Sequence, residues 1–230
     1  MIAAMLLAHL IADFVFQPDR LAIWKSEDWR GVAVHGLIVF LVTAFFVWLV
    51  APGWWVGVLF ISLVHLGIDM LAWIYFPGPV SLRRFLLDQA LHLATILVAL
   101  VAGGFLTDPS GMLTSRQHEG LLIALGLVFL SMPAWVLLKF VGYSLVESKP
   151  PVFQDGCSKY IGISERLIAV TLLILGQFLL LPLVLLPRLL LSRPLLFGPT
   201  HRAVHAFELL AGLTLAGMIA AGLTFSASVT

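Results

Sequence analysis

The stretch VGVLFISLVHLGIDMLAWIYF, from Val56 to Phe76, decides the class of fold to which this chain belongs. It has about the 20 residues that a helix needs to cross a bilayer. Its only acidic or basic side chains are those of Asp69 and His65. In lipid, a helix satisfies every backbone hydrogen bond within its own segment. The stretch therefore predicts a transmembrane helix that carries a histidine and an aspartate one turn apart.

The composition of the whole chain agrees with this stretch. Of 230 residues, 61% are hydrophobic and 11% are charged, and the mean hydropathy is +1.07, whereas a soluble domain carries about 25% charged residues. The net charge of +1 gives no basis for a nucleic-acid partner. Cys157 is the only cysteine, which excludes a disulfide within the chain and a thiolate metal cluster. We expect an all-α, polytopic transmembrane helix bundle.

Proline, glycine and charged residues divide the chain into about seven predicted membrane helices. Their expected ranges are Ile2–Gln17, Gly31–Val50, Val56–Phe76, Arg83–Leu106, Gly120–Gly142, Ile163–Leu186 and His201–Leu223. The first is expected to be a retained membrane helix, because no basic residue or small-residue cleavage site marks a signal peptide. Residues 1–142 would form a five-helix membrane bundle, residues 143–162 a polar cytoplasmic loop and residues 163–230 the C-terminal membrane helices. Pro187–Pro199 could lie in the interface or extend the sixth helix.

Basic residues predict the orientation of the bundle, because loops on the cytoplasmic side carry an excess of lysine and arginine. In the seven-helix arrangement, one side holds Arg20, Lys25, Arg30, Arg83, Arg84, Lys149 and Lys159. The other side holds mainly Arg116, Arg188, Arg193 and Arg202. The first side is therefore expected to be cytoplasmic, with the N-terminus outside and the C-terminus in the cytoplasm. Lys139 and Lys149 are expected to extend to the interface.

Ionisable residues in hydrocarbon are costly, and the first four predicted helices contain an unusual number of them. Three histidine–aspartate pairs are separated by four residues, so each pair lies on one helix face. The pairs are His9–Asp13, His65–Asp69 and Asp88–His92, and the second helix adds His35. The order within the pair inverts in the fourth helix, which places the carboxylates nearer the cytoplasmic end than the histidines throughout. We expect these groups to lie in overlapping layers.

Two ligands on one helix face can converge on one metal ion, as in the HExxH motif. The metal ligands predicted here are His9, Asp13, His35, His65, Asp69, Asp88 and His92. A mixture of imidazole and carboxylate suits a divalent metal such as zinc or manganese. Two alternatives stay open: the groups could form a proton or ion pathway, or they could be structural polar contacts between helices.

A metal cluster of this kind suits hydrolysis, because two ions can hold both the attacking and the leaving oxygen of a phosphoester. The carboxylates predicted to take part in catalysis are Asp13, Asp69 and Asp88. Gln17, Glu165 and Arg166 are candidate substrate-binding residues. Gln17 could equally be an ordinary helix-end residue, and Glu165 and Arg166 could simply pair with each other. His201, His205 and Glu208 share one face of the last helix, which we expect to be interfacial.

Five segments resemble a family of bacterial multi-pass membrane proteins catalogued as domain of unknown function thirty-three-oh-seven. They are LLAHLIADFVFQPDRLAIWK (Leu6–Lys25), the single His35, HLGIDM (His65–Met70), DQALH (Asp88–His92) and KYIGISERLI (Lys159–Ile168). The resemblance implies a bacterial cytoplasmic (inner) membrane location and no particular activity. A looser likeness to bacterial membrane-bound metal-dependent hydrolases, which also place histidine and aspartate at helix ends, implies a hydrolase.

These observations lead to three hypotheses for function. The first is a membrane-embedded, metal-dependent hydrolase that acts near the cytoplasmic face on a phosphoester or lipid head group. The second is a proton- or ion-coupled transporter, and the third is a non-enzymatic membrane module or sensor. The expected partners are the lipid bilayer and a small-molecule or lipid substrate, and association with further copies of the chain stays open.

Overall fold

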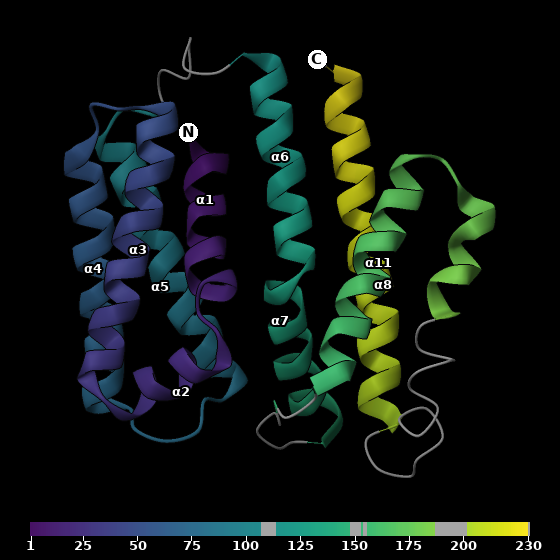
Figure 1. The fold of residues 1–230 in the computed structure, drawn as a ribbon, viewed down its shortest axis with the longest axis horizontal. Helices are drawn as coiled ribbons and strands as arrows, with labels where there is room; N and C mark the ends of the chain where they lie inside the picture. The colour runs from purple at the N-terminus through teal and green to yellow at the C-terminus, as the bar shows by residue number, and fades with distance from the viewer. Residues whose placement is uncertain (107–113, 148–152, 154–155, 187–201, 230) are drawn as a thin grey trace. The chain divides into compact units, whose positions relative to one another are not determined.

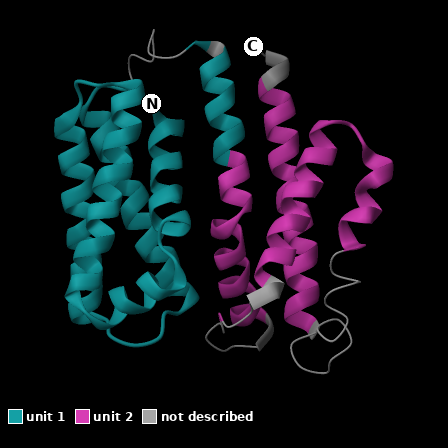
Figure 2. Cartoon of the chain, in the orientation of Figure 1, with its two compact units in different colours: residues 1–125 teal, residues 126–230 magenta. Residues whose placement is uncertain are grey.

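The computed structural model describes residues 1–106, 114–147, 153, 156–186 and 202–229 (Figure 1). Within these ranges every regular element is a helix. Four helices are long and apolar enough to cross a membrane, and two bent helix pairs raise the number to as many as six. The expected all-α polytopic bundle is therefore confirmed, and the part of the chain that the structure describes contains four to six of the seven or so expected spans. The chain divides into two compact units, Met1–Leu125 and Gly126–Thr230 (Figure 2).

The first unit is built around a four-helix bundle. Its elements are α1 (Ile2–Leu10) with the π-helical turn η1 (Ile11–Val15), α2 (Asp19–Glu27), α3 (Trp29–Val50), α4 (Trp55–Tyr75) and α5 (Leu82–Ala102). Helix α1 packs against α3 and α5, α3 packs against α4, and α4 packs against α5. The four helices thus enclose a common interior, and α2 runs across one end of them (Figure 1).

Glycine allows α3 and α4 to approach closely beside the interior. A Cβ atom on Gly36 would lie 2.8 Å from Leu66 Cδ1, closer than side chains normally pack. Gly36 follows His35 and Leu66 follows His65, so this contact lies next to both histidines. The absence of a side chain at position 36 therefore leaves room for the Leu66 side chain between the helices that carry them.

The segment after Pro18 corrects a sequence-based prediction. We expected a polar loop between the first two membrane helices, and the structure instead forms α2. Asp19 lies in its first turn and Lys25 in its last, which is the charge distribution that the helix dipole favours. The pair formed by Ile2–Val15 and Asp19–Glu27 is bent by 84°. Asp28 then begins α3 by accepting a hydrogen bond from the backbone of Arg30 at 2.8 Å.

The remaining elements belong mainly to the second unit. They are α6 (Ser115–Leu130), whose first residues fall in unit 1, α7 (Met132–Gly142), η2 (Tyr143–Glu147), α8 (Gly156–Ile174), the 3-10 segment η3 (Phe178–Leu185) and α11 (Arg202–Val229). Helix α11 packs against α7 and α8. The core between these helices includes Leu130, Val170, Val184 and Ala216.

Two helices expected to be continuous are interrupted in this region. The predicted helix Gly120–Gly142 is divided into α6 and α7 with a bend of 41°, because Pro133 has no N–H to continue the ladder. The predicted helix Ile163–Leu186 ends at Ile174, and Gly176 follows with φ of +68°, a conformation that favours glycine.

Several helix ends also differ from expectation. The first helix ends at Val15, the fourth ends at Ala102, and the last begins at Arg202 and reaches Val229. Helices α6 and α8 begin inside segments that were expected to be loops. The alternatives for Pro187–Pro199 fall outside the described residues.

Candidate metal centre

The structure brings all of the predicted metal ligands together inside unit 1. His9 comes from α1, Asp13 from η1, His35 from α3, and the two histidine–aspartate pairs from α4 and α5. The residues that are nearly inaccessible, at 7% exposure or less, are His9, Asp13, His35, His65, Asp69 and His92. The Asp88 side chain, at 29% exposure, is the most open member of the set.

The centre of the cluster consists of one ligand atom from each of four residues. His35 Nε2 and His65 Nε2 lie 3.2 Å apart. Asp13 Oδ1 lies 3.6 Å from each nitrogen. Asp69 Oδ2 lies 3.6 Å from His35 Nε2 and 3.4 Å from His65 Nε2. Neighbouring ligand atoms around a tetrahedral zinc ion, with bonds of about 2.0–2.1 Å, lie about 3.3–3.4 Å apart. The recorded separations of 3.2–3.6 Å are therefore compatible with a shared divalent ion.

The cluster extends to both sides of this centre. Three groups of ligand atoms lie within 4.8 Å of one another: His9, Asp13 and His65; His35, His65 and Asp69; and Asp69, Asp88 and His92. The first and third groups share no residue. The donors present could therefore hold one ion at the centre or one ion in each outer group.

Several ligand atoms are buried without a hydrogen-bond partner in the described structure. They include Asp13 Oδ1, Asp69 Oδ2 and both ring nitrogens of His92. A neutral imidazole has one donor and one acceptor nitrogen, and leaving such groups unsatisfied costs about 1–3 kcal/mol each. The His92 ring instead stacks on the His65 ring, with centroids 3.8 Å apart. These unsatisfied atoms fit metal ligands better than structural hydrogen-bonding groups.

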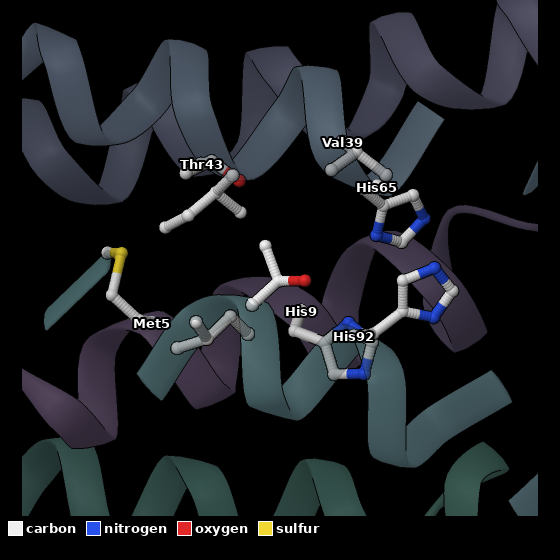
Figure 3. Close-up of a pocket in the computed structure, with 9 residues that line it drawn as sticks. Met5, His9, Val39, Thr43, His65 and His92 are labelled. Atoms are coloured by element: carbon white, nitrogen blue, oxygen red, sulfur yellow. The ribbon is translucent and has the colours of Figure 1, made fainter. Parts of the chain in front are cut away.

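A small cavity adjoins the histidines. It has a volume of about 10 Å³, close to the least that can hold one water molecule. His9, His65 and His92 line one end, and Met5 and Thr43 lie toward the other (Figure 3). The described residues that line the cavity do not include any of the three aspartates of the cluster. This fits the predicted depth order, in which the histidines lie beyond the carboxylates.

A local change in helix geometry positions Asp13. The backbone N–H of Phe16 donates to the carbonyl of Ile11 at 2.8 Å, a π-type bond that ends η1. Such π turns occur often at functional sites. His9 Nδ1 and Asp13 Oδ2 nevertheless lie 3.6 Å apart, so the predicted one-turn pair is present.

Lys25 was predicted only to lie on the basic side of the membrane. In the structure, this lysine contacts the cluster. Its Nζ lies 2.8 Å from Asp69 Oδ1. Lys25 lies on α2, outside the four long membrane helices. Burial opposes its charge, but the carboxylates of Asp69 and Asp13 outweigh this effect and raise its pKa above the usual value. The contact links residues far apart in sequence, so no local spacing could have indicated it.

Gln89 was also missed. Its Nε2 donates to Asp88 Oδ2 at 3.2 Å, and its Oε1 lies 3.3 Å from His9 Nε2. The amide therefore connects a carboxylate and an imidazole of the cluster, as outer partners of metal ligands do. Its position beside Asp88 in DQALH was the available signal.

The predicted substrate-binding residues have different surroundings. Gln17 follows η1 and has a buried Oε1 with no hydrogen-bond partner in the described structure. Glu165 and Arg166 are buried in unit 2. Arg166 Nε donates to the carbonyl of Leu130 at 2.7 Å, and its NH2 donates to that of Ser131 at 3.1 Å. Arg166 thus satisfies carbonyl groups at the α6–α7 break.

Lys139 corrects a prediction in the same unit. We expected its side chain to extend to the interface, but it is fully buried and its Nζ lies 3.1 Å from Glu208 Oε1. His205 Nδ1 lies 3.6 Å from Glu208 Oε2. His201 falls outside the described residues, so the expected three-residue face is described only in part.

The fold and the site together define a class: an all-α, polytopic helical bundle with a buried cluster of histidines and aspartates. Residues 1–119 match the DUF3307 family, described as a protein of unknown function, and the chain belongs to this family. The matched region contains the whole cluster and four of the five segments that carried the resemblance; Lys159–Ile168 lies outside it. The curated proteins and the solved structures gave no match.

Proposed function

We propose that this chain is a membrane-embedded, metal-dependent hydrolase that acts near the cytoplasmic face on a phosphoester or a lipid head group. The observation that carries the proposal is the convergence of four imidazoles and three carboxylates from separate helices in an otherwise apolar bundle. Ionisable side chains are costly in such surroundings unless they are paired or have a function. The unsatisfied nitrogens of His92 favour a bound ion over a purely structural network.

The donor set supports a borderline divalent metal, with zinc or manganese as the leading candidates, because both accept imidazole together with carboxylate. A single ion would be held at the centre by His35, His65, Asp13 and Asp69, whereas two ions would each be held by one of the outer groups. Such an ion polarises a phosphoryl oxygen and activates a bound water. Gln89 would orient His9 and Asp88 through its two hydrogen bonds.

Asp88 is the carboxylate best placed to take a proton from water while it also contributes a ligand oxygen, because its side chain is the most exposed of the three. In the proposed reaction, a water oxygen bonds to phosphorus while the bond from phosphorus to the leaving oxygen breaks. Asp88 accepts a proton from the attacking water, the leaving oxygen takes a proton from solvent as the alcohol departs, and Asp88 then returns its proton to solvent. Asp13 and Asp69, which are more deeply buried, would serve as metal ligands.

Hydrolysis of 4-nitrophenyl phosphate by the detergent-purified protein tests the proposal. We expect activity that disappears on chelation and returns with zinc or manganese. His92→Ala should reduce it by more than about tenfold, since even outer partners of metal ligands contribute that much. His118→Ala is the matched control, because His118 is exposed and lies outside the cluster. Activity that survives both chelation and His92→Ala would rule out a hydrolase working through this site.

A further inference from the structure

The exposed margin of the metal centre carries a cation as well as a carboxylate. The side chains of Lys25 and Asp88 are 21% and 29% exposed, whereas the other cluster residues are nearly inaccessible. Access from water is therefore concentrated where Lys25 and Asp88 lie. A ligand that enters there meets an ammonium group next to the metal ligands.

Asp69 connects this ammonium group to the metal centre. Its Oδ1 contacts Lys25 Nζ at 2.8 Å, while its Oδ2 faces His35 and His65. His92 Nε2 lies 3.9 Å from the same Oδ1, so the Asp69 carboxylate lies between the lysine and the imidazoles on both sides of it. This arrangement fixes the lysine beside the ion without placing it among the ligands.

Packing at the start of α3 also fixes the position of Lys25. A Cβ atom on Gly31 would lie 2.5 Å from the backbone nitrogen of Lys25 and 2.6 Å from the backbone carbon of Trp24. Only glycine allows α3 to pass so close to the α2 backbone. Lys25 is thus held by its main chain as well as by Asp69.

The ligand set accommodates two ions better than one. A single ion at the centre leaves His92 with two buried, unsatisfied nitrogens. An ion held by His9, Asp13 and His65, and a second held by Asp69, Asp88 and His92, would use six of the seven ligand residues. His35 lies between the two groups, 3.6 Å from both Asp13 Oδ1 and Asp69 Oδ2.

The charge of the loaded centre then requires an anion. With neutral imidazoles, the three carboxylates and Lys25 together carry a net charge of −2. One divalent ion neutralises this charge, and two leave a surplus of +2. Uncompensated charge is expensive in a buried, weakly polar site. A phosphate dianion would balance the surplus and accept hydrogen bonds from the ammonium group.

We propose that the centre binds two divalent ions and that Lys25 holds the phosphate group of the ligand against them. This inference rests on the proposed metal centre and specifies its ligand as a phosphoryl oxyanion. Lys25 is a substrate-binding residue in this account. The phosphate could belong to a lipid head group or to a soluble compound, because both present the same oxyanion at the margin.

The test measures two quantities on the detergent-purified full chain: metal content by mass spectrometry, and binding of radiolabelled inorganic phosphate by equilibrium dialysis. We expect about two ions per chain and metal-dependent phosphate binding. Lys25→Met should retain the ions and weaken phosphate binding by about ten- to hundredfold, the usual range for a charged hydrogen bond. Lys25→Arg should restore part of the affinity. Arg20→Met is the control, because it removes the same charge from an exposed position on α2.

The outcomes separate this inference from the proposed function. Absence of metal in the unmodified protein would overturn both. Two ions with phosphate affinity unchanged in Lys25→Met would overturn the role of Lys25 alone, and a single ion per chain would overturn the charge argument. If Lys25→Met does not fold, Gly31→Ala is measured in its place. Loss of phosphate binding by Gly31→Ala, with metal retained, supports the role of Lys25. Retained phosphate binding by this variant contradicts that role. Competition by phosphatidic acid would assign the phosphate to a lipid, and lack of competition would assign it to a soluble compound.

Discussion

At the scale of single residues, the proposed metal centre depends on histidine and aspartate side chains that come from different helices and face one another. The cluster residues were predictable because each histidine–aspartate pair is local, with its partners four positions apart on one helix face. Lys25 was not predictable, since its contact with Asp69 depends on how α2 folds across the end of the bundle. A lysine in a polar segment looks the same in the sequence whether it faces water or a carboxylate.

Asp69→Asn tests the double role of this carboxylate. The change preserves the size of the side chain but removes the charge that faces both Lys25 and the imidazoles. We expect the metal affinity to fall by more than about tenfold, measured by competition with a fluorescent chelator. Glu27→Gln is the control, because it removes a carboxylate from an exposed position on α2. Equal metal affinities in the two variants would show that Asp69 is not a ligand.

At the scale of helices, the long apolar segments were predictable and their interruptions were not. Helix α2 has nine residues, of which only Leu21 is buried. A short helix with so small an apolar face is difficult to recognise from its sequence. The break before Pro133 lies within a continuous apolar run, and proline is well tolerated in the first turn of a new helix. Hydropathy therefore indicated one span where the structure has two helices.

The close contact between α3 and α4 leads to a second prediction. Gly36→Val would force side-chain atoms against Leu66 and separate His35 from His65. We expect a loss of about 1–3 kcal/mol in the free energy of unfolding, as for other overpacked sites, together with weaker metal binding. Thermal unfolding with and without metal measures both effects.

Gly67→Val provides the comparison for that experiment. Gly67 lies on α4 two residues from His65, and a Cβ atom there meets nothing within 4 Å. The Gly67 variant makes the same glycine-to-valine change in helix propensity without pressing on α3. If both variants bind metal equally well, the α3–α4 spacing does not control the site.

At the scale of the whole molecule, the histidine–aspartate cluster lies in one of two compact units. The family match ends at residue 119 and unit 1 ends at Leu125, so unit 1 and the family region coincide closely, and both contain the whole cluster. The buried ion pair of Lys139 and Glu208 lies in the other unit. Composition predicted the fold class, while the division into units arises from long-range packing that no single segment encodes.

Binding of metal by the histidine–aspartate cluster can be measured by elemental analysis with mass spectrometry. The detergent-purified protein should be compared with the His65→Ala/Asp88→Ala variant after both have been incubated with zinc or manganese. The account predicts about one to two equivalents of metal per chain, lost in a variant that still folds. Absence of stoichiometric metal in the unmodified protein, after reconstitution with either ion, would contradict the account.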